Sequence, residues 1–207
     1  MRRLIALILL TATLALPAGA GDNMVPEPAF KTGLPGWITA WPNTQYYGEA
    51  NAKRLSMVAD PKDSGRGQVL QFDMPQGVGD VEGVMIASTM FPMQPYAKYE
   101  FGVDVYSTGP PPVVFVECYV KDPEMTEAGP DLYPGYRRVY RATIHVKNAK
   151  GKWAPQKRAI DLSKKAARYQ PDFMIIKLYA YLGKGKIYWH KPFVVMTEPP
   201  PADKVEK

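Results

Sequence analysis

Seven side chains with the chemistry to hold a flat, hydroxylated ligand occur on three alternating stretches of the chain. Aromatic rings pack against the apolar C–H faces of sugar rings, and charged side chains hydrogen-bond to sugar hydroxyls. The rings and charges alternate with aliphatic residues, so they fall on one face of each stretch. If the three stretches are neighbouring strands, these side chains form one ligand-binding face. Its members are Glu117, Tyr119, Arg141, His145, Lys177, Tyr179 and Tyr181.

A catalytic role for these residues has little support in the sequence. A glycosidase needs two carboxyl groups placed across one bond. Glu117 and Asp104 lie on the polar sides of predicted strands, but no motif marks them and such acids are usually solvated. The two histidines, His145 and His190, come with no nucleophile setting for a serine or cysteine and no metal-ligand spacing. We therefore expect no enzyme activity and no catalytic metal.

The elements that carry these residues are predicted to be strands. Residues 99–106 show the pattern clearly, because Tyr99, Phe101 and Val103 alternate with polar or small residues. One short helix is predicted, at 160–169. Many short strands, frequent turns and no repeat indicate an all-β antiparallel sandwich of the jelly-roll type. The predicted strands are 54–58, 68–74, 83–91, 99–106, 113–121, 137–147, 173–182 and 187–195.

The last two of these runs flank a short turn that holds Gly183 and Gly185. Glycine tolerates positive φ, so this arrangement predicts a β-hairpin. Every second residue from Met174 to Leu182 is aliphatic, and that face must be buried. The opposite face carries Phe173, Ile175, Lys177, Tyr179 and Tyr181.

Residues 1–20 have the features of a secretory signal peptide. Two arginines precede an apolar run, and small residues at 18–20 provide a cleavage site. No later apolar run is long enough to span a bilayer, so we expect an exported protein, periplasmic or extracellular, without membrane insertion. One β-sandwich domain is expected over 21–197, followed by a disordered tail rich in proline and charge at 198–207.

The charge balance and the single cysteine narrow the range of partners. The formal net charge is +6, and it falls to about +4 without the two arginines of the predicted signal peptide. The lysines and arginines are scattered and no nucleic-acid motif accompanies them, so no nucleic-acid partner is expected. Cys118 alternates with valines, which predicts a buried, reduced thiol and no disulfide within the chain.

Three groups of short motifs occur in order along the chain. They are Asn23, Phe30, Gly33, Gly36 and Trp37; then Tyr99-Glu-Phe-Gly-Val103; and finally Leu178-Tyr179, the Gly183 turn and Ile187-Tyr-Trp189. In this order they resemble the carbohydrate-binding modules of families four, nine, sixteen and twenty-two. The resemblance implies a galactose-binding-like jelly roll, and a polysaccharide or oligosaccharide held on the equivalent strands.

The resembling modules commonly hold a structural calcium ion through two acids, one after the opening Phe and one in the closing strand. Here those positions are Lys31 and His190. A lysine cannot ligate calcium, and imidazole is a poor ligand for a hard cation. Calcium is therefore disfavoured and no cofactor is expected, although Asp22, Asn23 and Glu27 could supply oxygens in another arrangement.

Two functions of different classes fit this sequence. The first is an exported, non-catalytic carbohydrate-binding protein that grips a polysaccharide or oligosaccharide on its aromatic and polar face. The alternative is an exported protein-interaction or assembly module without a sugar ligand. Tyrosines mixed with Arg or Glu favour a glycan, whereas a contiguous apolar patch favours a protein partner. The mixed pattern here favours the glycan.

Overall fold

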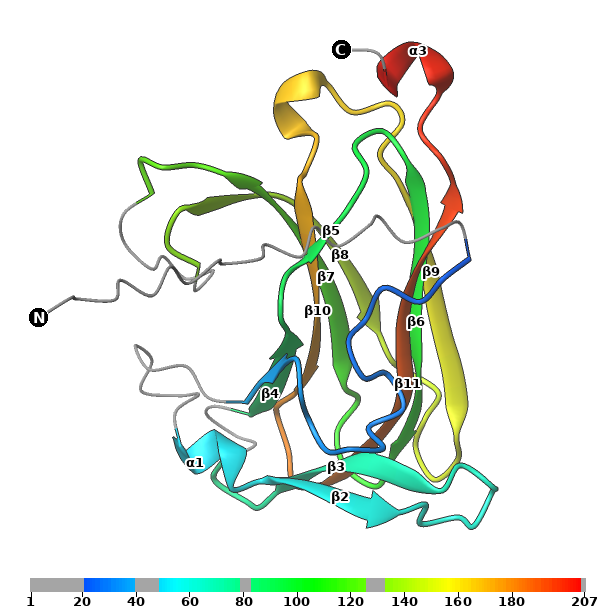
Figure 1. Cartoon of the computed structure of the whole chain (residues 1–207). Helices are drawn as coiled ribbons and strands as arrows, with labels where there is room; N and C mark the ends of the chain where they lie inside the picture. Colours follow the sequence, from blue (N-terminus) through cyan, green and yellow to red (C-terminus); the bar gives the residue numbers. More distant parts are fainter. Residues whose placement is uncertain (1–20, 40–48, 79–82, 126–132, 206–207) are drawn as a thin grey trace, which may run out of the picture.

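The computed structural model describes residues 21–39, 49–78, 83–125 and 133–205, which fold as two antiparallel sheets packed face to face (Figure 1). The predicted signal peptide, residues 1–20, lies outside the described residues. Three short helical turns are described: α1 (Glu49–Ala52), η1 (Ala167–Tyr169) and α3 (Ala202–Val205). Within the described ranges, none of the helices has the length and apolar character needed to cross a membrane. The prediction of an all-β sandwich is confirmed.

We name each sheet after its central strand. The β10 sheet contains β1 (Trp37–Ile38), β4 (Val84–Ser88), β5 (Phe91–Pro92), β7 (Val113–Lys121), β8 (Tyr136–His145) and β10 (Phe173–Ala180). Its order is β1-β4-β10-β7-β8, with β5 also paired to β10. The β11 sheet contains β2 (Leu55–Ala59), β3 (Gln68–Met74), β6 (Lys98–Ser107), β9 (Ala154–Asp161) and β11 (Gly185–Glu198). Its order is β2-β3-β11-β6-β9.

The hydrophobic core lies between the inner faces of the two sheets. Period-two alternation decides which side chains enter it, as the sequence predicted. Met174, Ile176 and Leu178 of β10 are fully buried there, together with Trp189 of β11. Cys118 of β7 is also fully buried and free, so the prediction of a core thiol is confirmed.

The predicted hairpin between the last two strands is wrong. β10 pairs with β4, β5 and β7, whereas β11 pairs with β3 and β6, so the turn between them carries the chain from one sheet to the other. Leu182, predicted to be buried, leaves the strand with φ of 57° and is 65% exposed. Gly185 lies so close to Gly109 that an added Cβ would come within 2.5 Å of the Gly109 Cα. The glycines therefore serve a tight crossing and not a hairpin.

The helix predicted at 160–169 is also largely wrong. Ile160 and Asp161 are the last residues of β9, and only one turn, η1, follows. β9 forms because it pairs along its whole length with β6, which buries Ile160 in the core. Tertiary pairing has overridden the weak local preference of this segment.

The N-terminal segment 21–38 links the two sheets across one side of the sandwich (Figure 1). Asn23 bridges to Val195 of β11, and Trp37 then pairs with Ser88 of β4. Phe30 is fully buried, and its ring lies 5.5 Å from the Trp37 ring, so these two side chains anchor the segment to the core. At the other terminus, α3 follows β11 in the tail that was predicted to be disordered.

Candidate functional site

The three strands expected to carry the ligand face are neighbours in the β10 sheet. β7 lies between β10 and β8, and Glu117 of β7 is opposite Ile175 on one side and Arg141 on the other. The core takes the aliphatic face of each strand, so the polar and aromatic residues point outward. The predicted sidedness of β7, β8 and β10 is therefore confirmed, although only part of this outer face is open to solvent.

Glu117 is the centre of a buried charged group, which we call the Glu117 cluster. Its side chain is 2% exposed and forms an ion pair with the Lys177 ammonium, which is itself buried. Arg138 Nη1 donates to Oε1 at 2.9 Å, and the Tyr119 hydroxyl donates to Oε2 at 2.7 Å. Arg141 Nε lies 3.6 Å from Oε1. Four side chains thus share one carboxylate, as a buried anion requires.

The surroundings of Glu117 fix its protonation state. Burial alone raises the pKa of the carboxyl group, but the Lys177 charge and the hydrogen bonds from Lys177 and Tyr119 outweigh burial. The pKa therefore lies below the ordinary value of 4.5. A general acid in glycoside hydrolysis needs a raised pKa. Glu117 is instead an anion at neutral pH that holds its neighbours in place.

One end of this face is closed by the segment that leads into β8. Tyr119 is fully buried, and the Tyr133 ring packs edge-on against it at 5.4 Å. Tyr136 covers Phe173 in the same way, with ring centroids 5.5 Å apart. Three of the seven predicted ligand residues, Glu117, Tyr119 and Lys177, therefore lie beneath other side chains. Their role as ligand contacts stays a prediction.

The other end of the face is open and aromatic. Tyr179 and Tyr181 stack with ring centroids 5.0 Å apart and an interplanar angle of 10°. Tyr181 is 36% exposed. The Phe115 ring lies 6.3 Å from the Tyr179 ring, and the Arg141 guanidinium carbon lies 3.9 Å above the Phe115 ring. Arginine, phenylalanine and two tyrosines thus form a continuous row, which we call the aromatic row.

The last predicted residue, His145, lies at the end of β8 beside this row. It is exposed, and it is opposite Val113, which is in turn opposite Tyr179. Two strand spacings, about 10 Å, therefore separate the backbones of His145 and Tyr179. The structure brings Arg141, His145, Tyr179 and Tyr181 together around one exposed area.

Two residues of this face were missed from the sequence. Arg138 reaches Glu117 because a bulge lies between the pairs Cys118–Tyr140 and Tyr119–Arg138, which breaks strict alternation in β8. Phe115 was passed over as one more apolar residue, although its position in phase with Glu117 and Tyr119 would have placed it on the outer face. A bulge leaves no comparable signal in a single sequence.

The structure separates the two acids that could have formed a glycosidase pair. Glu117 faces outward from the β10 sheet, and Asp104 faces outward from the β11 sheet on the far side of the core. Across the described ranges, no group of three or more His, Cys, Asp or Glu side chains is arranged to hold a metal ion.

No protein-family model matches this chain, and no curated protein matches it. Solved structures are similar in fold. A family 16 carbohydrate-binding module has 13% identity and a TM-score of 0.51, over 84% of this chain and 99% of the module. The tandem CBM22 domains of Paenibacillus barcinonensis Xyn10C have 16% identity and a TM-score of 0.52, over 93% of this chain and 50% of theirs.

An enzyme domain shares the same fold. The enzymatically active domain of tailspike protein 4 of bacteriophage CBA120 has 11% identity and a TM-score of 0.54, over 84% of this chain and 21% of the tailspike chain. The predicted resemblance to carbohydrate-binding jelly rolls is thus confirmed as a similarity of fold.

Proposed function

We propose that this chain is a non-catalytic carbohydrate-binding protein that holds a polysaccharide or oligosaccharide against the open end of the β10 sheet. The observation that carries the proposal is the stacked pair Tyr179 and Tyr181, whose rings are nearly parallel and form an edge of the aromatic row. Flat aromatic surfaces of this kind suit the C–H face of a pyranose ring. The similarity of fold to carbohydrate-binding modules supports the same proposal.

Polar groups beside the row can take the hydroxyls of the sugar. Arg141 is half-exposed over Phe115, and His145 is exposed two strands from Tyr179. In this proposal Glu117 and Lys177 act from beneath, because they hold Arg141 and the neighbouring backbone in place. Rigid support of this kind keeps a binding surface in the productive geometry.

The charged groups support binding without catalysis. Glu117 has a lowered pKa and is enclosed by cations, and Asp104 lies on the opposite side of the sandwich. A pair of carboxyl groups across one glycosidic bond is the usual requirement of a glycosidase. We propose that the chain supplies the affinity and that any cleavage of the glycan belongs to another protein.

We also propose that the protein is exported after removal of residues 1–20. The support is the charged start, apolar run and small-residue site in that segment. Expression of the full chain followed by N-terminal sequencing of the exported product tests this proposal. A product that begins near Gly21 is expected, whereas an unprocessed chain retained with the cells contradicts it.

The binding proposal is tested by a glycan array on the mature protein, followed by calorimetry with the best ligand. A wet, partly polar site should bind with a Kd in the micromolar to millimolar range, about −4 to −8 kcal/mol. Tyr181→Ala should weaken binding about fivefold, because one stacking ring contributes on the order of 1 kcal/mol. The melting temperature should stay nearly unchanged, since Tyr181 lies beyond the end of β10.

Tyr169 provides a matched control. It is 39% exposed, close to the 36% of Tyr181, and it lies in η1 at the opposite end of β10 (Figure 1). Tyr169→Ala should leave the affinity unchanged. Equal loss in both variants, or a broad array that yields no ligand, would contradict the proposal and favour the protein-interaction alternative.

A further inference from the structure

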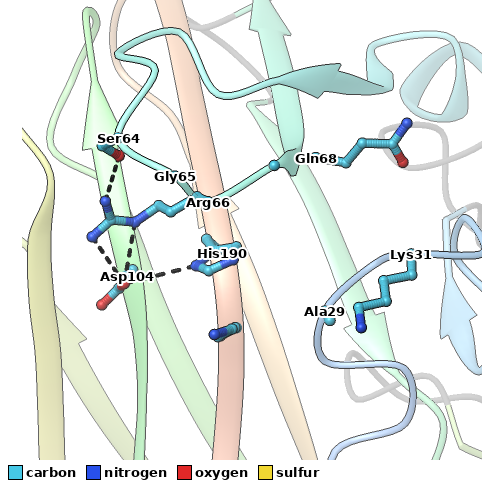
Figure 2. A pocket seen from close by; sticks show the side chains of 10 residues that line it. Ala29, Lys31, Ser64, Gly65, Arg66, Gln68, Asp104 and His190 are labelled. Carbon is cyan, nitrogen blue, oxygen red and sulfur yellow. Dashed lines mark hydrogen bonds and ion pairs between the residues drawn. The ribbon is translucent and has the colours of Figure 1, made fainter.

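The outer face of the β11 sheet holds a second candidate site, remote from the aromatic row. A hollow of about 690 Å³ opens between the N-terminal segment and the loop that joins β2 to β3. Figure 2 shows Arg66, Asp104 and His190 on one side of it and Lys31 on the other. We call it the His190 hollow. Lys191 also lines it.

His190 lines the hollow and lies beside Asp104 (Figure 2). The residue is 5% exposed, and its Nδ1 atom has no hydrogen-bond partner among the described residues. The nearest acid is Asp104, whose Oδ2 lies 3.8 Å away and is already taken by Arg66 Nε at 3.3 Å and Nη2 at 3.2 Å. Buried polar atoms in folded proteins are nearly always paired, so an imidazole that lacks a hydrogen bond at Nδ1 and lines a hollow is a candidate for interaction with a ligand.

The charges around His190 determine the sign of that ligand. The Arg66–Asp104 ion pair is neutral overall, and in the described part of the chain neither Lys31 nor Lys191 forms an ion pair. Two acids lie behind the lining: Glu27 accepts hydrogen bonds from the backbone N–H groups of Lys31 and Thr32, and Asp60 accepts one from the backbone N–H of Ser64. Among the side chains that line the hollow, Lys31, Arg66 and Lys191 outnumber Asp104, so the lining carries an excess of positive charge.

The titration of His190 agrees with this sign, and the backbone beside it is strained. Lys191 has φ of 48°, an uncommon value for a residue with a side chain, at the irregularity of β11 between His190 and Phe193. Strain of this kind persists at functional positions. Burial lowers the pKa of His190, and the positive charge of Lys191 lowers it further, whereas Asp104 opposes the shift. Such surroundings disfavour a cation and favour an anion.

We propose that the His190 hollow binds an oxyanion, a sulfate, phosphate or carboxylate group, between His190, Lys191 and Lys31. The free ion and the same group carried on a saccharide share this chemistry. The sequence resemblance placed Lys31 and His190 at positions where related modules use acids for calcium, and the structure brings both residues to this hollow. A lining with two lysines repels calcium and attracts the opposite charge.

The test uses the two histidines of the chain as reporters. The mature protein, labelled with isotopes at histidine, is titrated with sodium sulfate at constant ionic strength maintained with chloride. The His190 resonances should shift and saturate, and the pKa of His190 should rise because a bound anion stabilises its protonated form. His145, exposed at the end of β8 in the other sheet, should not move and serves as the internal reference.

Variants then assign the site. Lys31→Gln and Lys191→Asn should each weaken sulfate binding severalfold, and asparagine tolerates the positive φ of position 191. Both lysines are exposed, so folding should be retained. Lys164→Gln, an exposed lysine of the connection between β9 and β10, is the control and should bind sulfate as the parent chain does.

Two further titrations, one with a sulfated tetrasaccharide and one with calcium chloride, test whether the anion is carried on a saccharide and whether the hollow binds calcium instead. Tighter binding of a sulfated tetrasaccharide than of sulfate would assign the group to a saccharide, and equal binding would assign it to the free ion. The proposal is overturned if His190 shifts no more with sulfate than with chloride, or if calcium chloride alone saturates the same resonances.

Discussion

The outer face of each sheet carries a buried titratable side chain, Glu117 in one sheet and His190 in the other, and the two differ in how completely they are paired. Glu117 in the β10 sheet contacts Lys177, Arg138, Tyr119 and Arg141. His190 in the β11 sheet is almost as deeply buried, yet its Nδ1 atom has no hydrogen-bond partner within the described ranges. The degree of burial therefore does not by itself indicate whether a polar side chain has a structural or a binding role.

This difference in pairing distinguishes a group that stabilises the structure from a group that is available to bind a ligand. A fully paired buried network rigidifies the structure around it, and loss of any partner is expensive. A buried polar atom without a hydrogen bond does not stabilise the fold, and a ligand that supplies the missing partner can gain free energy from it. In the proposed carbohydrate-binding function, the Glu117 cluster is the base of a surface whose ligand contacts are the exposed residues of the aromatic row. His190 lines a hollow, and in our proposal it contacts the ligand directly.

Glu117→Gln should cause the largest loss of stability among these substitutions. It tests most directly whether Glu117 stabilises the fold more than His190 does. The substitution removes the anion from the cluster while the Lys177 ammonium stays buried. Removal of one partner from a buried ion pair costs about 3–5 kcal/mol. Urea denaturation at pH 7 should show a fall of this size in the free energy of unfolding.

A second substitution separates the lost anion from a general loss of packing. Glu117→Gln combined with Lys177→Met should recover much of the stability, because the unpaired ammonium is then gone as well. A loss below about 1 kcal/mol for Glu117→Gln alone would show that the cluster is no more important to stability than a surface ion pair.

The pH dependence of stability sharpens the same contrast. Because the pKa of Glu117 is lowered in the folded state, the unfolded chain takes up a proton at higher pH than the folded one does. The stabilisation should be complete above the ordinary value of 4.5 and should be lost as the pH falls toward the folded-state pKa. Unfolding measured from pH 7 to pH 3 should show this loss in the parent chain. In Glu117→Gln that part of the pH dependence should be absent.

Cys118→Ser should cause an intermediate loss of stability. Cys118 lies in the core between the two sheets. The thiol is fully buried among apolar residues, and burial raises its pKa well above the usual range. A hydroxyl in its place should cost about 1–3 kcal/mol of the free energy of unfolding, because a buried polar group without a partner is unfavourable. Thiol reagents should label the native protein slowly. Fast labelling would show that β7 opens readily or faces the other way.

His190→Phe should have the smallest effect. The histidine gives up no hydrogen bond at Nδ1, and a ring of similar size can keep the contact with Trp153, whose centroid lies 6.3 Å away. Replacement of an unpaired polar group by an apolar one is close to neutral, so the free energy of unfolding should change by less than about 1 kcal/mol. A loss of 3 kcal/mol in thermal or urea unfolding would mean that His190 is held as firmly as Glu117.

Strand patterning could be predicted from this sequence because a single rule, alternation, decides it. The run 113–121 matches β7 at both ends, and the run 68–74 matches β3 in the same way. Pairing between strands could not be predicted from pattern alone. The segment 173–195 has all the local features of a hairpin, yet each of its strands finds better partners in a different sheet.

The candidate site could be predicted only in part, for a related reason. Alternation correctly placed Arg141, Tyr179 and Tyr181 on one outer face. It could not reveal that Tyr133 covers Tyr119, because that contact joins a strand to a loop of irregular structure. The hollow around His190 was beyond sequence reasoning, since Lys31, Arg66 and His190 come from three distant parts of the chain.

The crossing between β10 and β11 has a consequence for the order of folding. β10 joins β4 to β7, and β11 joins β3 to β6, so the final strands of the chain are the central strands of both sheets. A nascent chain that stops before Phe173 holds only separate pairs of edge strands, and neither sheet is continuous. Contacts between distant parts of a chain form slowly. Both sheets of this domain can therefore become continuous only after β10 and β11 have been synthesised, and until then its strands can pair only two by two.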